Sequence, residues 1–294
     1  MDTFQAEFAA FARSAWPGGR LRIAPTPSGF LHLGNALNFT LNWLVARLAP
    51  AGRLLLRIDD LDADRKRDEY VQDVFDTLEW LGLDWDEGPR SAADFEMNWS
   101  QHLRLDLYRN LLDDLRRRNF LFACRKSRRD LAPYHGEYPS AFRNQGLDLD
   151  DPDVAWRIMT PPGFPMPDFV VRRRDGIPAY QIASLADDFR YGITHIVRGE
   201  DLLASTRAQG FLAECLERPD FQWIQCLHHP LITDASGEKL SKSAGAASLR
   251  YLREHDGSPQ VVYAQTAQLL GLEQRSYWSA EELLAEVRNW MGQG

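Results

Sequence analysis

The stretch that decides the fold is Ala24-Pro-Thr-Pro-Ser-Gly-Phe-Leu-His32-Leu-Gly34-Asn35. A short apolar strand over Leu21–Ile23 leads into it, and apolar residues at helical spacing follow it from about 35 to 48. The first turn of a helix has unpaired N–H groups and the positive end of a dipole, which suits a phosphate chain. We therefore predict that His32 donates to phosphate oxygens and that Gly34 lets a nucleotide approach the backbone. A turn with a helix-capping histidine is the alternative.

The segments that follow predict alternating strands and helices. Residues 53–58 form an apolar run typical of a buried strand, and residues 70–81 have one apolar helical face. A third helix is expected over 103–115, and strands are expected over 169–172 and 194–197. Strand, helix, strand and helix in this order indicate an α/β fold with a parallel sheet.

The chain has 294 residues, 44% of them hydrophobic, and a formal net charge of -8. The acidic balance argues against a purely electrostatic nucleic-acid binder, so contact with RNA would need a local patch. Three cysteines without a CxxC pair, no signal-peptide pattern and no run of 18 apolar residues lead us to expect a cytoplasmic protein that does not enter a membrane. A monomer is favoured.

A second polar motif is Gly237-Glu-Lys239-Leu-Ser241-Lys242-Ser243. Two lysines at this spacing are able to neutralise a leaving pyrophosphate. Taken alone, a motif of this kind is usually a solvated surface loop. Its position about 200 residues after His32 suits a nucleotide-binding fold that is split by an insertion.

Together the two motifs resemble the HIGH and KMSKS signatures of class I aminoacyl-tRNA synthetases, with Asn35 in place of the second histidine and Leu240 in place of methionine. Five further segments resemble the glutamyl-tRNA synthetases: Arg22–Gly29, Arg57–Asp62, Leu83–Pro89, Pro178–Gln181 and Ile193–Asp201. The resemblance implies a Rossmann-type parallel sheet with an inserted subdomain and a C-terminal helical segment. We expect the core at 1–88 and 178–222, the insertion at 89–177 and a stem-contact and helical region at 223–294.

The resemblance also implies roles for individual residues. The catalytic set is His32, Lys239 and Lys242, and the ATP-binding set is His32, Gly34, Asn35, Lys239, Ser241 and Lys242. The amino-acid-binding set is Arg22, Ala24, Thr26, Asp59, Tyr180, Ser184 and Arg198. A guanidinium matches a carboxylate with two hydrogen bonds, so Arg198 is expected to select glutamate. The alternative is that Arg198 pairs with Glu200 or Asp201.

Two positions depart from the glutamyl pattern. Asp59 stands where those enzymes have glutamate, and Ser184 stands where a larger polar residue is common. The aspartate at position 59 keeps glutamine open as a substrate, and the serine at position 184 is expected to enlarge the site. No residue is expected to bind a resident metal ion, and magnesium is expected to arrive with ATP.

Only about 50 residues follow Ser243, and this plan resembles the glutamyl-Q-tRNA(Asp) synthetases, which attach glutamate to queuosine in the anticodon of tRNA-Asp. Members of that family often hold a zinc ion with a CxC pair, a tyrosine and a later cysteine. Here only Cys124 remains, and Cys124 with His135 is a poor set because zinc takes four ligands, so zinc is predicted to be absent. A ligase with a non-tRNA acceptor and a non-catalytic ATP- or glutamate-binding regulatory paralogue are the alternative functions.

Overall fold

The computed structural model describes residues 3–134, 138–231, 248–255, 257–273 and 275–292. The chain divides into two compact units. Unit 1 comprises residues 1–100, 192–201 and 224–294, and unit 2 comprises residues 101–191 and 202–223. These bounds differ from the three functional segments expected from the sequence, and that finer division stays a prediction.

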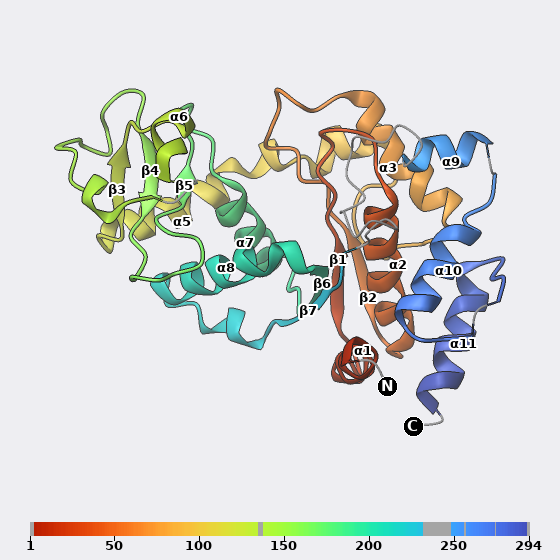
Figure 1. The fold of residues 1–294 in the computed structure, drawn as a ribbon. Coiled ribbons are helices and arrows are strands. Elements are labelled where there is room, and N and C mark those ends of the chain that lie inside the picture. Colours follow the sequence, from red (N-terminus) through yellow and green to blue (C-terminus); the bar gives the residue numbers. More distant parts are fainter. Residues whose placement is uncertain (1–2, 135–137, 232–247, 256, 274, 293–294) are drawn as a thin grey trace. The chain divides into compact units, whose positions relative to one another are not determined.

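Unit 1 contains the parallel strands and most of the helices around them (Figure 1). Its elements are α1 (Thr3–Ser14), β1 (Arg20–Ile23), α2 (Leu33–Leu48), β2 (Arg53–Leu56), α3 (Asp68–Trp80), α4 (Ala92–Asp94), the π-helix η1 (Phe95–Trp99), β6 (His195–Gly199), β7 (Gln225–His229), α9 (Leu249–His255), α10 (Gln260–Leu269) and α11 (Ala280–Gly292). The 3₁₀ turn η5 (Glu200–Leu202) follows β6. Strands β1 and β2 form one parallel pair, and β6 and β7 form another.

Hydrogen bonds join the two pairs at the start of their strands. The Thr194 N–H donates to the Arg20 carbonyl oxygen at 3.0 Å, and the Arg20 N–H donates to Thr194 Oγ1 at 2.9 Å. On the other side of β2, the Leu56 N–H donates to the Glu87 carbonyl oxygen at 2.9 Å. The parallel α/β architecture expected from the sequence is therefore confirmed.

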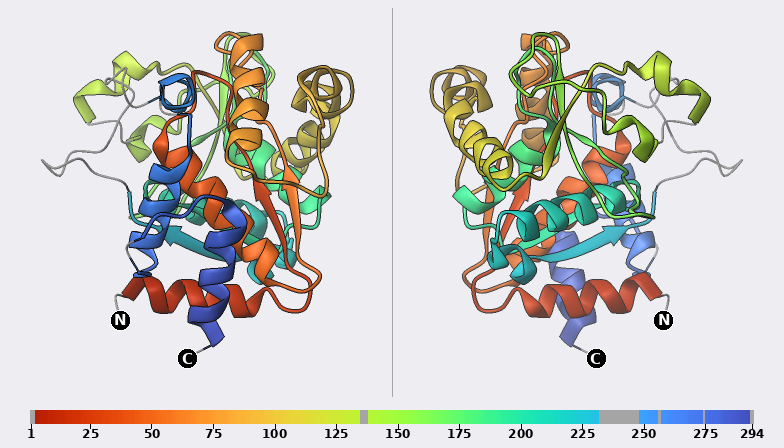
Figure 2. Two further views of the ribbon diagram at one scale, coloured as in Figure 1. Left: turned by 90° about the vertical axis from the view of Figure 1, so that its right-hand side faces the viewer. Right: turned by 90° about the vertical axis from the view of Figure 1, so that its left-hand side faces the viewer.

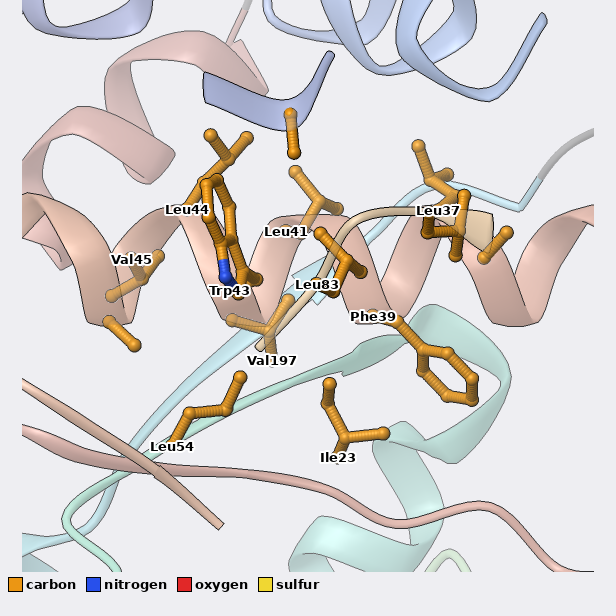
Figure 3. Packing of buried hydrophobic residues seen from close by; sticks show 14 of the residues in the cluster. Ile23, Leu37, Phe39, Leu41, Trp43, Leu44, Val45, Leu54, Leu83 and Val197 are labelled. Atoms are coloured by element: carbon orange, nitrogen blue, oxygen red, sulfur yellow. The ribbon is translucent and has the colours of Figure 1, made fainter. Parts of the chain in front are cut away.

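Helix α2 is the centre of the hydrophobic core. Figure 3 shows its side chain Phe39 on the side of the strand residues Ile23, Leu54 and Val197. The opposite side of α2 packs against α10 and α11, so both sides of this helix are buried. Because both sides are buried, α2 has more apolar residues around its circumference than an amphipathic helix with one buried side.

Helix α1 and the end of α11 lie side by side, where Arg13 Nη2 donates to the Met291 carbonyl oxygen at 3.2 Å (Figure 2). Ser279 caps the start of α11, because the Glu282 N–H donates to Ser279 Oγ at 3.2 Å. The Glu282 carboxylate accepts from the Trp278 N–H at 2.8 Å, one residue earlier than a capping box requires.

Unit 2 combines helices with a small antiparallel sheet. Its elements are the 3₁₀ turn η2 (Gln101–Arg104), α5 (Leu105–Arg117), β3 (Leu121–Cys124), α6 (Arg128–Leu131), the 3₁₀ turns η3 (Ala132–Tyr134) and η4 (Ser140–Phe142), β4 (Ala155–Ile158), β5 (Val170–Arg172), α7 (Tyr180–Arg190), α8 (Leu203–Cys215) and the 3₁₀ turn η6 (Pro219–Trp223). The sheet order is β3-β4-β5. The sequence predicts only β5 of this sheet, and the four-residue strands β3 and β4 show no clear periodic pattern.

Candidate active site

In unit 1, three of the residues expected to bind substrate, Ala24, Thr26 and Asp59, lie just beyond the carboxyl ends of β1 and β2. The Arg57 N–H donates to the Ile23 carbonyl oxygen at 2.8 Å, and the Asp59 N–H donates to the Pro25 carbonyl oxygen at 2.9 Å. The chain after β2 thus runs beside the chain after β1, which brings Asp59 close to the segment that holds Ala24 and the exposed Thr26. Strand β1 has β2 on one side and β6 on the other, so this is a switch point where ligands bind in open parallel sheets.

His32 is the N-cap residue of α2 and has an extended backbone, with φ −123° and ψ 171°. Its N–H donates to Asn35 Oδ1 at 3.0 Å, and the Asn35 N–H donates to the His32 carbonyl oxygen at 2.8 Å. A Cβ added at Gly34 would lie 3.1 Å from His32 Cε1, so glycine leaves room for the imidazole. The capping interpretation therefore applies to the pair His32 and Asn35, and a role of either residue toward phosphate stays a prediction.

Arg57 and Asp59 form a buried ion pair immediately after β2. Arg57 Nε donates to Asp59 Oδ1 at 2.7 Å, and Nη2 donates to Oδ2 at 3.0 Å, with side-chain exposures of 2% and 5%. Residues two apart in an extended segment point to the same side, which is why these two side chains meet. The carboxylate expected to bind the substrate ammonium is therefore held in a fixed orientation, and the sequence analysis did not identify Arg57 as the residue that holds it.

The neighbouring Asp60 anchors the same segment from the other side. Ser100 Oγ donates to Asp60 Oδ2 at 2.7 Å, and Lys66 Nζ lies 3.1 Å from the same oxygen. Lys66 also pairs with Glu96, and although burial lowers the pKa of Lys66, its two carboxylate partners outweigh burial and raise it. Because Asp60 is buried and bound in this way, we assign it a structural role rather than a substrate contact.

Arg22 and Arg198 are both buried, with 4% and 2% exposure. The adjacent strand residues Ile23 and Val197 belong to the core that contains α2. Since neighbouring residues of a strand point to opposite faces, both arginines face the side of the strands away from α2. Two guanidinium groups on one face make this the part of unit 1 best suited to carboxylate groups.

Arg198 affects the pKa of a histidine in the neighbouring strand β7. His228 lies directly beside Arg198 in the parallel register. Burial and the positive charge of Arg198 lower the pKa of His228. A neutral His228 adds no further positive charge beside the guanidinium.

Side-chain amides of α2 fix the helix to β6 and β7, which the sequence analysis did not anticipate. Asn38 Nδ2 donates to the Val197 carbonyl oxygen at 3.1 Å and lies 3.2 Å from His229 Nε2, while Asn42 Nδ2 donates to the same carbonyl at 3.1 Å. His229 Nδ1 is 2.9 Å from the Pro230 carbonyl oxygen, so Nδ1 donates there and Nε2 accepts from Asn38. Burial lowers the pKa of His229, consistent with this neutral form.

Tyr180 and Ser184 lie on α7 in unit 2, Tyr180 partly exposed and Ser184 fully buried. One turn further along α7, the buried Asp187 accepts from Arg104 Nε at 2.7 Å, Gln101 Nε2 at 3.0 Å and Tyr108 Oη at 3.0 Å. Burial would lower the pKa of Arg104, but its pairing with Asp187 raises it instead. This network joins α7 to η2 and α5. The roles of Tyr180 and Ser184 toward the amino acid stay predictions.

Lys239, Ser241 and Lys242 fall within 232–247, outside the described residues. The chain on either side of that segment is described. Before it, the Leu231 N–H donates to Glu200 Oε1 at 3.4 Å. After it, Ser248 forms an antiparallel bridge with His32, and the Leu249 N–H donates to the Leu31 carbonyl oxygen at 2.9 Å.

Among the described residues, no group of three or more histidine, cysteine, aspartate or glutamate side chains is arranged to hold a metal ion. In the same part of the chain, no helix combines the length and apolarity needed to cross a bilayer.

Comparison with known proteins agrees with this geometry. The family described as tRNA synthetases class I (E and Q), catalytic domain, matches residues 20–138 and 142–289. Among solved structures, a glutamate-tRNA synthetase from Elizabethkingia anophelis has a TM-score of 0.70 at 22% identity, over 92% of this chain and 65% of that chain. A glutamate tRNA ligase from Elizabethkingia meningosepticum has a TM-score of 0.67 at 20% identity, over 94% and 69%. The fold and the site thus define a class I tRNA synthetase catalytic core.

Comparison with curated relatives places the chain in one group within this family. A glutamyl-Q tRNA(Asp) synthetase from Synechococcus sp. (strain CC9605) is 41% identical over 286 residues, 94% of this chain and 92% of the relative. One from Nitratidesulfovibrio vulgaris is 36% identical over 287 residues, 86% of each chain. The chain belongs to the class I tRNA synthetases for glutamate and glutamine, within the group of glutamyl-Q tRNA(Asp) synthetases.

Proposed function

We propose that this protein uses ATP to activate glutamate as glutamyl-adenylate and transfers the glutamyl group to tRNA, specifically to queuosine in the anticodon of tRNA-Asp. The observation that carries the first half is the pair of buried arginines, Arg22 and Arg198, on one face of the strands at the switch point. The second half is supported by the names of the relatives that match the chain over most of their length.

The reaction needs no nucleophile from the protein. A carboxylate oxygen of glutamate attacks the α-phosphorus of ATP, the bond to the bridging oxygen breaks, and magnesium pyrophosphate leaves. An acceptor hydroxyl then attacks the carbonyl carbon, and AMP leaves with the mixed-anhydride oxygen. Catalysis of the first step consists of positioning and stabilisation of charge at the phosphates.

His32 and the start of α2 fit the phosphate side of this reaction. The N-terminal end of the α2 dipole favours an anion, and the His32 imidazole lies over Gly34 at the same helix end. Lys242 is six residues before Ser248, which bridges to His32. Lys239 is nine residues before Ser248. Segments of six and nine residues extend to at most about 20 Å and about 30 Å, lengths that allow both lysines to approach the same phosphates.

For the amino acid, we assign Arg198 to the side-chain carboxylate and Asp59 to the ammonium group. We also assign Tyr180 and Ser184 of α7 to amino-acid binding, and Ser184 is smaller than the polar residue that is common at this position in the glutamyl enzymes. The Asp59 side chain is one methylene shorter than the glutamate that is usual at this position. Its carboxylate is bound by two hydrogen bonds from Arg57, the first residue after β2.

The acceptor is tested with labelled glutamate and two tRNA-Asp samples, one with queuosine and one with guanosine at the same position. The proposal predicts stable labelling of the queuosine tRNA alone. Equal labelling of both samples would contradict queuosine as the acceptor, and the Lys242→Ala variant should label neither. Adenylate formation without labelling of either tRNA would favour a non-tRNA acceptor.

A further inference from the structure

A compact side-chain cluster in unit 2 consists of Cys124, Lys126, Tyr138 and Phe142, which we call the Cys124 cluster. Cys124, the last residue of β3, is fully buried, and Tyr138 is 4% exposed. The Cys124 sulfur lies 3.2 Å from Tyr138 Oη and accepts from the Lys126 N–H at 3.2 Å. The thiol thus connects the end of the strand with the segment that begins at Tyr138.

The other half of the cluster is a cation on an aromatic ring. Lys126 Nζ lies 4.8 Å from the centroid of the Phe142 ring. Tyr138 and Phe142 pack edge to face, with centroids 5.9 Å apart. Each cation–aromatic contact of this kind stabilises modestly, more when water is excluded.

Gln145 closes the hydrogen-bond network. Its Nε2 donates to Tyr138 Oη at 2.8 Å and to the Phe142 carbonyl oxygen at 2.8 Å. Burial would raise the pKa of the Cys124 thiol, but hydrogen bonds from Tyr138, Gln145 and the Lys126 N–H outweigh it and lower the pKa. The sulfur is therefore well supplied with donors and acts as an acceptor.

The cluster does not fit the zinc ion that the family resemblance implies. A structural zinc takes four nitrogen, sulfur or oxygen ligands in a tetrahedron. Of the four side chains, Cys124 and Tyr138 offer suitable donor atoms, Phe142 offers none, and the Lys126 ammonium opposes a second cation at the same place. Residues 135–137 lie outside the described residues, so the experiment below includes them.

We propose that the Cys124 cluster holds the segment 138–145 against β3 without a metal ion. A thiol–phenol hydrogen bond and a lysine–phenylalanine contact occupy the place where related enzymes bind zinc with CxC, tyrosine and cysteine. Lys126 stands two residues after Cys124, as the second cysteine of CxC would, and Phe142 follows Tyr138 as the later cysteine would. The inference does not depend on the proposed function.

The first test measures metal in the unaltered protein, expressed in zinc-supplemented medium, by elemental analysis. The proposal predicts substoichiometric zinc and the same Tm with and without EDTA. One zinc per chain, with a Tm that falls on chelation, would overturn it. In that case His135→Ala would show whether residues 135–137 supply the missing ligands.

The second test introduces the two missing zinc ligands with the double substitution Lys126→Cys and Phe142→Cys. If the four positions surround one point, this variant gains about one zinc per chain and a Tm that falls by several degrees on chelation. The matched control adds Cys124→Ala to the double variant and should lose the zinc. A folded double variant without zinc would contradict the replacement of a metal site, and the measurement on the unaltered protein stands whether or not the variant folds.

Discussion

Arg57 binds Asp59 with two hydrogen bonds in a buried environment, from Nε to Oδ1 at 2.7 Å and from Nη2 to Oδ2 at 3.0 Å. Asp59 is the carboxylate that we assign to the substrate ammonium. Its orientation therefore depends on a residue that need not touch the substrate, and Arg57 is a positioning residue.

Arg57→Lys keeps the positive charge and removes the bidentate fork. We expect the KM for glutamate to rise by about 10-fold, the equivalent of one charge-assisted hydrogen bond, with the KM for ATP unchanged. Arg65→Lys is the control, because Arg65 also pairs with a nearby aspartate, Asp62, but is 63% exposed. Equal increases in both KM values would show that Arg57 supports the fold in general rather than the amino-acid pocket.

Asn35→Ala removes the acceptor of the His32 N–H. The cost to the free energy of unfolding is about 1 kcal/mol, the usual size of a helix-cap contact. We also expect slower adenylate formation, because His32 loses its fixed position at the start of α2. Ser279→Ala removes the comparable cap of α11 and should lower stability equally without slowing the reaction. The two helix caps are compared by thermal unfolding and by pyrophosphate exchange, and equal activity of both variants would count against a role of Asn35 in the site.

Asp187→Asn removes the negative charge that pairs with the Arg104 guanidinium, whose side-chain exposure is 9%. Breaking a buried ion pair from one side costs about 3–5 kcal/mol, measured by urea unfolding. Asp150→Asn is the control in the same unit, because Asp150 also binds an arginine, Arg116, with both oxygens but is 69% exposed. It should cost about 1 kcal/mol or less. Similar losses at both sites would refute the importance assigned to burial.

We predict that the protein loses stability in mild acid because of three histidines in unit 1. Burial lowers the pKa of His195, His228 and His229. The unfolded chain, with histidine pKa values near 6.5, then binds protons that the folded chain does not, so the free energy of unfolding falls as the pH drops below about 6.5 and is unaffected above it. The slope is at most about 1.4 kcal/mol per pH unit for each histidine. His229→Asn should reduce the slope, and an unchanged profile would exclude His229 as a contributor.

The sequence predicts the parallel core well because its signals are local. The leucines of 35–48 and the apolar run from Arg53 have clear periods, and the structure places α2 and β2 there. The start of α2 is earlier than expected, at Leu33, because Asn35 is a partner of the cap and not its first residue. The pairing of Arg57 with Asp59 is predictable from the sequence, because Arg-x-Asp in an extended segment puts both side chains on one side.

Other features depend on pairs that are far apart in the chain. Asp187 meets Arg104 across 83 residues, and Asn38 meets His229 across 191, so no local pattern indicates either contact. The short strands β3 and β4 are too brief for periodicity, and they pair only because the fold brings them together. The roles of individual residues toward glutamate and ATP stay predictions.

The central claim is tested most directly by amino-acid-dependent exchange of pyrophosphate into ATP, without tRNA, for glutamate, glutamine and aspartate. The account predicts exchange with glutamate alone, and a loss of exchange in Arg198→Ala that reflects a raised KM for glutamate with little change for ATP. Exchange with glutamine in place of glutamate would contradict the role assigned to Arg198 and point to Asp59 and Ser184 as residues that have altered the pocket. No exchange with any of the three, with or without total tRNA, would contradict adenylation itself.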